Sequence, residues 1–202
     1  MIRTKNYRLG EEKYNYQGYL MRIVEYNNAN DIVVEFQDEY KGKTHTSYQH
    51  FITGRINNPY HQNVYNVGMI GDKYPTCING KATKEYGLWK DVLKRCFCEN
   101  YKKKCPTYEN VTCCDEWLLF EKFYEWLHSQ PNFDKWLNGG RWCIDKDILI
   151  KGNKTYSYNN CTLVPQNVNT LFVKNDATRG NLPIGVVKHG NKFLAVCINP
   201  FT

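Results

Sequence analysis

Apolar and polar positions change their period twice along the chain, and the first stretch has the pattern of β-strands. From Gly18 to Val34, β-branched and aromatic residues lie on both sides of the turn-forming cluster 27–30, which predicts a β-hairpin. The segment 44–51 follows a polar break, and we expect it to add a further short strand. Short strands at this spacing predict a small antiparallel β-barrel over residues 1–70, followed by a linker at 68–75.

The middle of the chain changes to helical spacing. Apolar residues recur every three or four positions over 86–97 and again over 118–127, where Asp115 is a suitable N-cap. Both segments are predicted to be amphipathic helices. We expect their aromatic residues to pack in a core rather than to stack on nucleic-acid bases, because they keep to one helix face. Residues 71–140 are therefore predicted to form a two-helix connector.

After Gly140 the strand pattern returns. Residues 142–150 are predicted to be a strand, residues 151–160 form a polar, turn-rich loop, and residues 161–164 are a short apolar strand. Pro165 then opens a helix, because proline is favoured in a first helical turn. The whole pattern, with separate strand-rich and helical stretches, places the chain in the α+β class.

The composition indicates a folded chain that does not cross a membrane. Its 202 residues are 42% hydrophobic, 15% aromatic and 23% charged, enough apolar material for a core. The longest apolar run is Phe193–Ile198, far below the roughly 18 residues of a membrane span. Residues 1–6 lead into polar sequence without the apolar stretch of a signal peptide. We therefore expect a cytoplasmic protein.

The net charge of +7 is concentrated near the C-terminus. Residues 141–202 carry 8 Lys and Arg against 3 Asp and Glu, whereas the two preceding thirds each carry a net charge of +1. A basic segment in a nearly neutral chain is what a nucleic-acid contact surface needs, because neutralising phosphates releases counterions. On charge alone, a merely solvated basic face fits equally well.

Nine cysteines in a chain without a secretory signal favour reduced thiols over disulfides. A zinc site is the competing interpretation, since several cysteines fall between positions 96 and 114. No C-x-x-C pair occurs, and Cys96 and Cys114 have aromatic and apolar neighbours, which favours buried thiols over structural zinc. A zinc-stapled structural protein remains a third hypothesis, to be tested by elemental analysis.

Three short segments in the last third together resemble a known motif. They are Ile144-Asp145-Lys146, then Asn159-Asn160-Cys161-Thr162-Leu163-Val164, then Asn167-Val168-Asn169. Their order and spacing resemble the ββα-metal motif of the HNH endonucleases, and the elements around 95–96 and 111–117 resemble those that precede the motif in phage-borne members. Downstream, 182–187 and 192–196 resemble the opening strands of the apetala/ethylene-response DNA-binding domain that is often fused to phage homing endonucleases.

This resemblance implies a DNA-binding protein of a phage or mobile element, with Mg²⁺ or Mn²⁺ as cofactor. Asp145 and Asn169 would hold the metal ion, Asn160 would hold the intervening loop, and Lys146 occupies the position of the general base. These four residues are the candidate catalytic site. The candidate phosphate contacts are Lys146, Lys151, Lys154, Lys174, Arg179, Lys188 and Lys192.

Lys146 departs from the family, which has a histidine at this position. An ordinary lysine is protonated at pH 7 and cannot accept a proton from water. Three alternatives stay open for the base: a deprotonated, buried Lys146, His189 from the C-terminal hairpin, or Asp147. Alternation along an extended strand would place Asp145 and Asp147 on one face and Lys146 on the other.

Two functional hypotheses follow. The first is a metal-dependent endonuclease acting on double-stranded DNA in the cytoplasm of a bacterial host. The second, which Lys146 favours, is a catalytically degenerate binder, either a DNA-binding accessory or an inhibitor of a host defence nuclease such as an anti-CRISPR. In both, we expect a β-barrel module over 1–70, the connector over 71–140, an HNH-like unit over 141–176 and a partial DNA-binding β-hairpin over 177–202.

Overall fold

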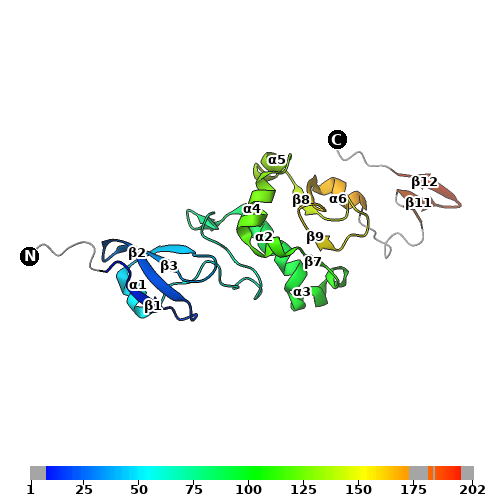
Figure 1. Cartoon of the computed structure of the whole chain (residues 1–202). Helices are drawn as coiled ribbons and strands as arrows, with labels where there is room; N and C mark the ends of the chain where they lie inside the picture. Colours follow the sequence, from blue (N-terminus) through cyan, green and yellow to red (C-terminus); the bar gives the residue numbers. More distant parts are fainter. Residues whose placement is uncertain (1–7, 173–181, 184, 197–202) are drawn as a thin grey trace, which may run out of the picture. The chain divides into compact units, whose positions relative to one another are not determined.

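The computed structural model describes residues 8–172, 182–183 and 185–196, and it divides the chain into two compact units, residues 1–127 and 128–202. Small antiparallel sheets and six α-helices make up the described residues, which gives the expected α+β class (Figure 1). Among these residues, no helix has both the length and the apolar character that a bilayer crossing requires.

The first unit begins with a four-stranded antiparallel sheet in the order β1-β2-β3-β4. The predicted hairpin is confirmed: β2 and β3 are antiparallel and pair Met21 with Phe36. The strands span β1 (Glu12–Tyr14), β2 (Leu20–Asn28), β3 (Asp31–Phe36) and β4 (Lys43–Thr46).

The predicted closed barrel is wrong, because within the described residues the sheet is open, with β1 and β4 as its two edges. A barrel needs its edge strands to pair with a regular stagger, and these edges are only three and four residues long. The segment expected as a further strand instead forms β4 and then the helix α1 (Tyr48–Thr53). Ser47 caps this helix by accepting the amide of His50, and Gly54 ends it with a φ of 68°.

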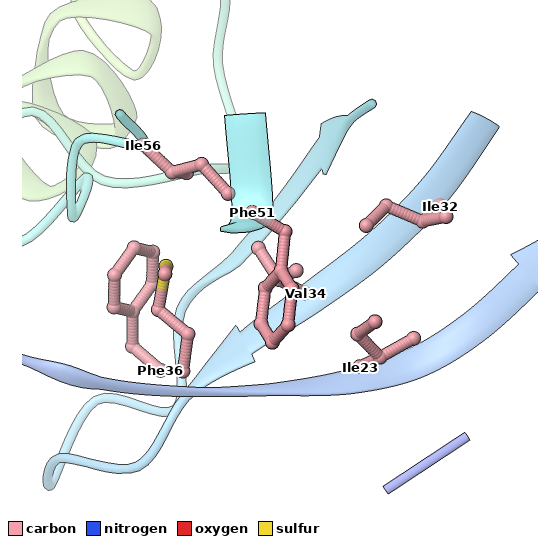
Figure 2. Packing of buried hydrophobic residues seen from close by; sticks show 7 residues of the cluster. Ile23, Ile32, Val34, Phe36, Phe51 and Ile56 are labelled. Carbon is pink, nitrogen blue, oxygen red and sulfur yellow. The ribbon is translucent and has the colours of Figure 1, made fainter. Parts of the chain in front are cut away.

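Helix α1 covers the apolar face of the sheet, and it thereby buries the side chains that a closed barrel would have enclosed. Figure 2 shows Phe51 of α1 among the aliphatic side chains of β2 and β3, with Ile56 beyond the helix. These side chains form one buried cluster. Its members are Met21, Ile23, Ile32, Val34, Phe36, Phe51 and Ile56.

The segment expected to be a linker is fixed within the first unit. Met69 donates its amide to the carbonyl of Leu118 at 2.8 Å and accepts the amide of Phe120 at 2.9 Å. Glu121, 2% exposed, accepts the amides of Asp72 and Lys73 through Oε1. These bonds join residues 68–73 to the first turn of the helix α4 (Phe120–His128).

The two predicted helices are present with shifted ends. The first is α2 (Lys84–Phe97), capped by the Thr83 hydroxyl, which accepts the amide of Tyr86. Asp115 does not cap the second helix directly, because it begins the 3₁₀ turn η2 (Asp115–Leu118), and α4 (Phe120–His128) starts after that turn. The remaining elements of this stretch are β5 (Cys77–Ile78), β6 (Lys81–Ala82), α3 (Glu99–Lys104), η1 (Pro106–Tyr108) and β7 (Thr112–Cys113).

Aromatic residues form the core between α2 and α4, as the helical pattern predicts. Trp89, Trp117 and Phe120 are each at most 1% exposed, and the Trp89 and Phe120 ring centroids lie 5.4 Å apart. The indole Nε1 of Trp89 donates to the carbonyl of Trp117 at 2.7 Å. These rings are packed against one another and are not available to stack on bases.

The second unit contains a strand, loop, strand and helix in sequence. Strands β8 (Trp142–Asp145) and β10 (Thr162–Pro165) are antiparallel and pair Asp145 with Thr162. The helix α6 (Gln166–Phe172) follows directly and packs against both strands. The unit also includes α5 (Phe133–Leu137), β9 (Thr155–Tyr156), and a hairpin of β11 (Val186–His189) with β12 (Lys192–Ala195).

Two details of this unit differ from expectation. The strand predicted over 142–150 ends at Asp145, so residues 146–150 belong to the following loop. Pro165 is the last residue of β10 and the helix begins at Gln166. The whole connection from 146 to 161 is called loop 146–161 below.

Candidate functional site

Asp145 ends strand β8 and starts loop 146–161. Its Oδ1 accepts the backbone amides of Asp147 and Ile148, both at 2.7 Å. These two bonds turn the chain away from the strand direction, in the way aspartate side chains often initiate turns. Within the described residues, the other carboxylate oxygen, Oδ2, makes no hydrogen bond, so Asp145 keeps one oxygen that can bind a cation.

Lys146 lies buried in the loop, with 8% of its surface exposed. Its Nζ donates to Oδ1 of Asp147 at 2.5 Å and to the carbonyl of Asn153 at 3.0 Å, and it lies 5.9 Å from the ring centroid of Tyr156. Because the strand ends at Asp145, the expected separation of Lys146 and Asp147 onto opposite faces is wrong. An ammonium that donates to a carboxylate and a carbonyl has no lone pair with which to accept a proton.

The loop is held mainly by Asn153, a residue that the sequence comparison with the HNH motif does not single out. Its Nδ2 donates to the carbonyls of Lys146 at 2.8 Å and Thr155 at 2.7 Å, and its Oδ1 accepts the Thr155 amide. The amide of Asn153 also donates to the carbonyl of Ile150. The Gly152-Asn153 pair, with Gly152 at a φ of 81°, is the one sequence signal for this turn.

Asn160, to which the resemblance assigns the holding of the loop, lies in a different turn. Its amide donates to the carbonyl of Ser157 at 3.2 Å, as does the amide of Cys161. This turn leads the chain into β10. The bonds that join the beginning of the loop to its later part come from Lys146 and Asn153 instead.

Asn169, the second predicted metal ligand, is half-buried on α6. Asp145 and Asn169 would offer oxygen donors, which suit Mg²⁺ and Mn²⁺ better than Zn²⁺. Two protein ligands fit a Mg²⁺ ion that keeps several waters and binds substrate phosphate. In the part of the chain that the structure describes, no three His, Cys, Asp or Glu side chains gather as a metal site.

The predicted phosphate contacts fall into three groups. Lys151 and Lys154 are exposed on loop 146–161. Lys188 and Lys192 are exposed on the hairpin of β11 and β12, where His189, one alternative for the base, is exposed as well. Lys174 and Arg179 lie outside the described residues.

Two neighbouring cysteines of the first unit, Cys113 and Cys114, are held as neutral thiols. The hydrogen bond with Cys96, together with burial, raises the pKa of Cys113 far above the ordinary range of a thiol. Burial and the neighbouring Glu116 raise the pKa of Cys114 to about 11. Metal coordination needs thiolates, so these environments favour packing over zinc binding.

Comparisons of the chain with protein-family models, curated proteins and solved structures return no match. The resemblance to the HNH endonucleases therefore depends on the quoted residues and on the order β8, loop 146–161, β10 and α6.

Proposed function

We propose that the second unit binds double-stranded DNA, with the exposed lysines of loop 146–161 contacting the phosphates. The observation that carries this proposal is the loop itself: Lys151 and Lys154 project to solvent from a backbone that Lys146 and Asn153 hold in place. A fixed loop loses little conformational entropy when it binds, so its two charges contribute most of their attraction to affinity. The net charge of +5 over 141–202 acts in the same direction.

Lys146 acts in this proposal as the internal support of the loop. Its ammonium donates hydrogen bonds to the Asp147 carboxylate and the Asn153 carbonyl, and its side chain is buried. Lys146 is therefore not placed to contact a phosphate or to activate water. This replaces two roles expected from the sequence, general base and phosphate contact, with a structural one. The chain is then a nuclease-like fold whose main activity is binding.

The test is DNA affinity as a function of salt, measured by fluorescence anisotropy with the full chain and a labelled duplex. Each phosphate contact adds about 0.9 to the slope of log K against log salt. Lys151→Gln with Lys154→Gln should therefore lower that slope by roughly 1.8. The matched control is Lys13→Gln with Lys81→Gln, two exposed lysines of the first unit that give the same change in net charge.

A slope that is equal in the loop variant and in the unmodified chain would overturn the assignment of the loop. Affinity that does not depend on salt would overturn DNA binding itself. A chain that fails to bind DNA would favour the alternative of an inhibitor that docks on a host defence protein.

A second candidate function is metal-dependent DNA cleavage, which the oxygen Oδ2 of Asp145 specifically favours. With Asn169 it would hold Mg²⁺ or Mn²⁺, and the bound ion would stabilise negative charge on the phosphate. The sharp variant is Asp145→Asn, because an amide oxygen still accepts the amides of Asp147 and Ile148 while the carboxylate charge is lost.

If cleavage occurs, nicking of supercoiled plasmid should disappear in Asp145→Asn while DNA affinity persists. Asp145→Ala should lose both nicking and the turn. Absence of nicking by the unmodified chain with either metal would remove this candidate and leave the DNA-binding proposal standing.

A further inference from the structure

Two large aliphatic side chains are exposed side by side in the basic loop. Leu149 and Ile150 expose 57% and 52% of their surface, directly before Lys151. Single exposed apolar residues are common on protein surfaces and need no explanation. An adjacent pair followed by the exposed Lys151, with the exposed Lys154 three residues further on, is a more specific arrangement. It combines the apolar tip of the loop, Leu149 and Ile150, with charges that attract an anionic partner.

The tip is held by the same hydrogen bonds that organise the loop. The carbonyl of Ile150 accepts the amide of Asn153 at 3.0 Å, and the amide of Ile148 donates to Asp145 at 2.7 Å. Leu149 and Ile150 therefore lie between two fixed points of the backbone. Their exposure is a property of a constrained turn and not of a free chain end.

Building on the proposed DNA binding, we propose that Leu149 and Ile150 form an apolar wedge that enters the minor groove and separates neighbouring base pairs. Proteins that bend DNA from the minor groove use leucine and isoleucine in this way, and the unstacking is offset by the additional contacts that the bend permits. Lys151 and Lys154 would hold the phosphates beside the wedge. The partner is thus duplex DNA in a kinked form, favoured at flexible pyrimidine–purine steps.

An anionic lipid surface is the other partner that lysines and aliphatic groups can attract. Loop 146–161 offers it only two exposed aliphatic side chains, whereas peripheral membrane binding uses a broad apolar face, as in an amphipathic helix. A base-pair step, in contrast, is opened by one or two apolar side chains. The small size of the apolar tip therefore favours DNA.

The experiment measures bending and affinity together, by energy transfer between dyes at the two ends of a duplex with a central TA step. The variant is Leu149→Ser with Ile150→Ser, which alters exposed side chains and leaves the hydrogen bonds of the loop in place. We expect loss of the bend and an affinity about tenfold lower. The matched control is Ile78→Ser, a 56% exposed isoleucine in the first unit, which should change neither quantity.

The outcomes separate this inference from the proposed function. If Lys151→Gln with Lys154→Gln lowers the salt slope while the serine variant still bends and binds DNA normally, the wedge is refuted and DNA binding stands. If the unmodified chain binds no duplex but sediments with vesicles containing phosphatidylserine, both proposals are wrong. Competition by a drug that fills the minor groove should reduce bending, and bending that is insensitive to the drug would also refute the wedge.

Discussion

Replacing the buried Glu121 should destabilise the first unit more than replacing an exposed glutamate does. This carboxylate is 2% exposed, and its Oε1 accepts three hydrogen bonds, from the hydroxyl of Tyr60 at 3.1 Å and from the amides of Asp72 and Lys73 at 2.9 and 3.0 Å. Its Oε2 lies 3.5 Å from Nζ of Lys73. One buried side chain thus connects segment 68–73 to α4.

The magnitude follows from what each donor can recover. A bond to a charged acceptor contributes about 1.5–3 kcal/mol. In Glu121→Ala, the amides of the exposed Asp72 and Lys73 can regain only the weaker bonds to water, and the Tyr60 hydroxyl keeps its bond to Oδ1 of Asp72 at 3.0 Å, so the main loss is that of three bonds to a buried charged acceptor. We therefore expect a loss of about 3–4 kcal/mol. Glu121→Gln keeps an acceptor oxygen at the same place and loses mainly charge assistance, about 1–2 kcal/mol, since the ion pair with Lys73 is half in solvent.

Amide hydrogen exchange, followed by mass spectrometry on peptides covering 68–75 and 115–127, reports on this unit alone. Exchange should accelerate on the order of a hundredfold in Glu121→Ala and about tenfold in Glu121→Gln. The control is Glu125→Gln, whose partner Lys122 lies 3.2 Å away on the surface of α4; it should cost less than about 0.5 kcal/mol. Equal acceleration in the alanine and glutamine variants would refute the role given to Oε1, and so would less than a tenfold effect of alanine.

Three further predictions concern the first unit. Gly71→Ala should cost at least about 2 kcal/mol in urea unfolding, because Gly71 has a φ of 82° and an added Cβ would collide with the Glu121 carboxylate. Burial, then the hydrogen bond to Asp72, raises the pKa of Tyr60 above its ordinary value near 10, so the folded state keeps a proton that the unfolded state releases. Stability should fall as pH rises above about 10, and Tyr60→Phe should make that fall shallower; an unchanged pH profile in the variant would contradict this. In alkylation by iodoacetamide at pH 8, the exposed Cys77 should react well before the half-buried Cys113, and labelling of Cys113 as early as Cys77 would contradict its raised pKa.

Local patterns predict local structure well in this chain. The hairpin at 18–34 and the two amphipathic helices follow from periodicity that each segment carries by itself. Whether the sheet closes into a barrel could not be predicted from these local patterns. Closure depends on whether β1 and β4 pair, and the spacing of apolar residues within one strand does not determine its pairing with another. What covers the open sheet is Phe51, on a six-residue helix whose polar neighbours conceal its apolar face.

The candidate site was predictable in part for the same reason. The order of strand, loop, strand and helix around Asp145 was predicted, but the pattern extended the first strand to residue 150, whereas it ends at Asp145, opposite Thr162. The burial of Lys146 was one of the open alternatives, and strand alternation could not decide it, because alternation assumes that the strand continues. The two backbone amides that Asp145 accepts end the strand instead. The role of Asn153 in holding the loop could not be predicted, because asparagine after glycine is common in ordinary turns. The two carbonyl groups to which its side chain donates belong to residues seven and two positions away in the chain.

Lys146 has a consequence for any cleavage reaction. Its ammonium pairs with the carboxylate of Asp147 and donates to the carbonyl of Asn153. Loss of a proton would leave a neutral amine that can still donate both bonds but no longer has the charge attraction to Asp147. A base that must give up this charge attraction in every turnover is poorly placed for catalysis, and Asp147 is engaged by the same ammonium. Of the three alternatives for the base, only the exposed His189 lies outside the loop, on the hairpin of β11 and β12. Cleavage that survives His189→Ala would therefore require a proton acceptor from outside the candidate residues, such as the substrate phosphate.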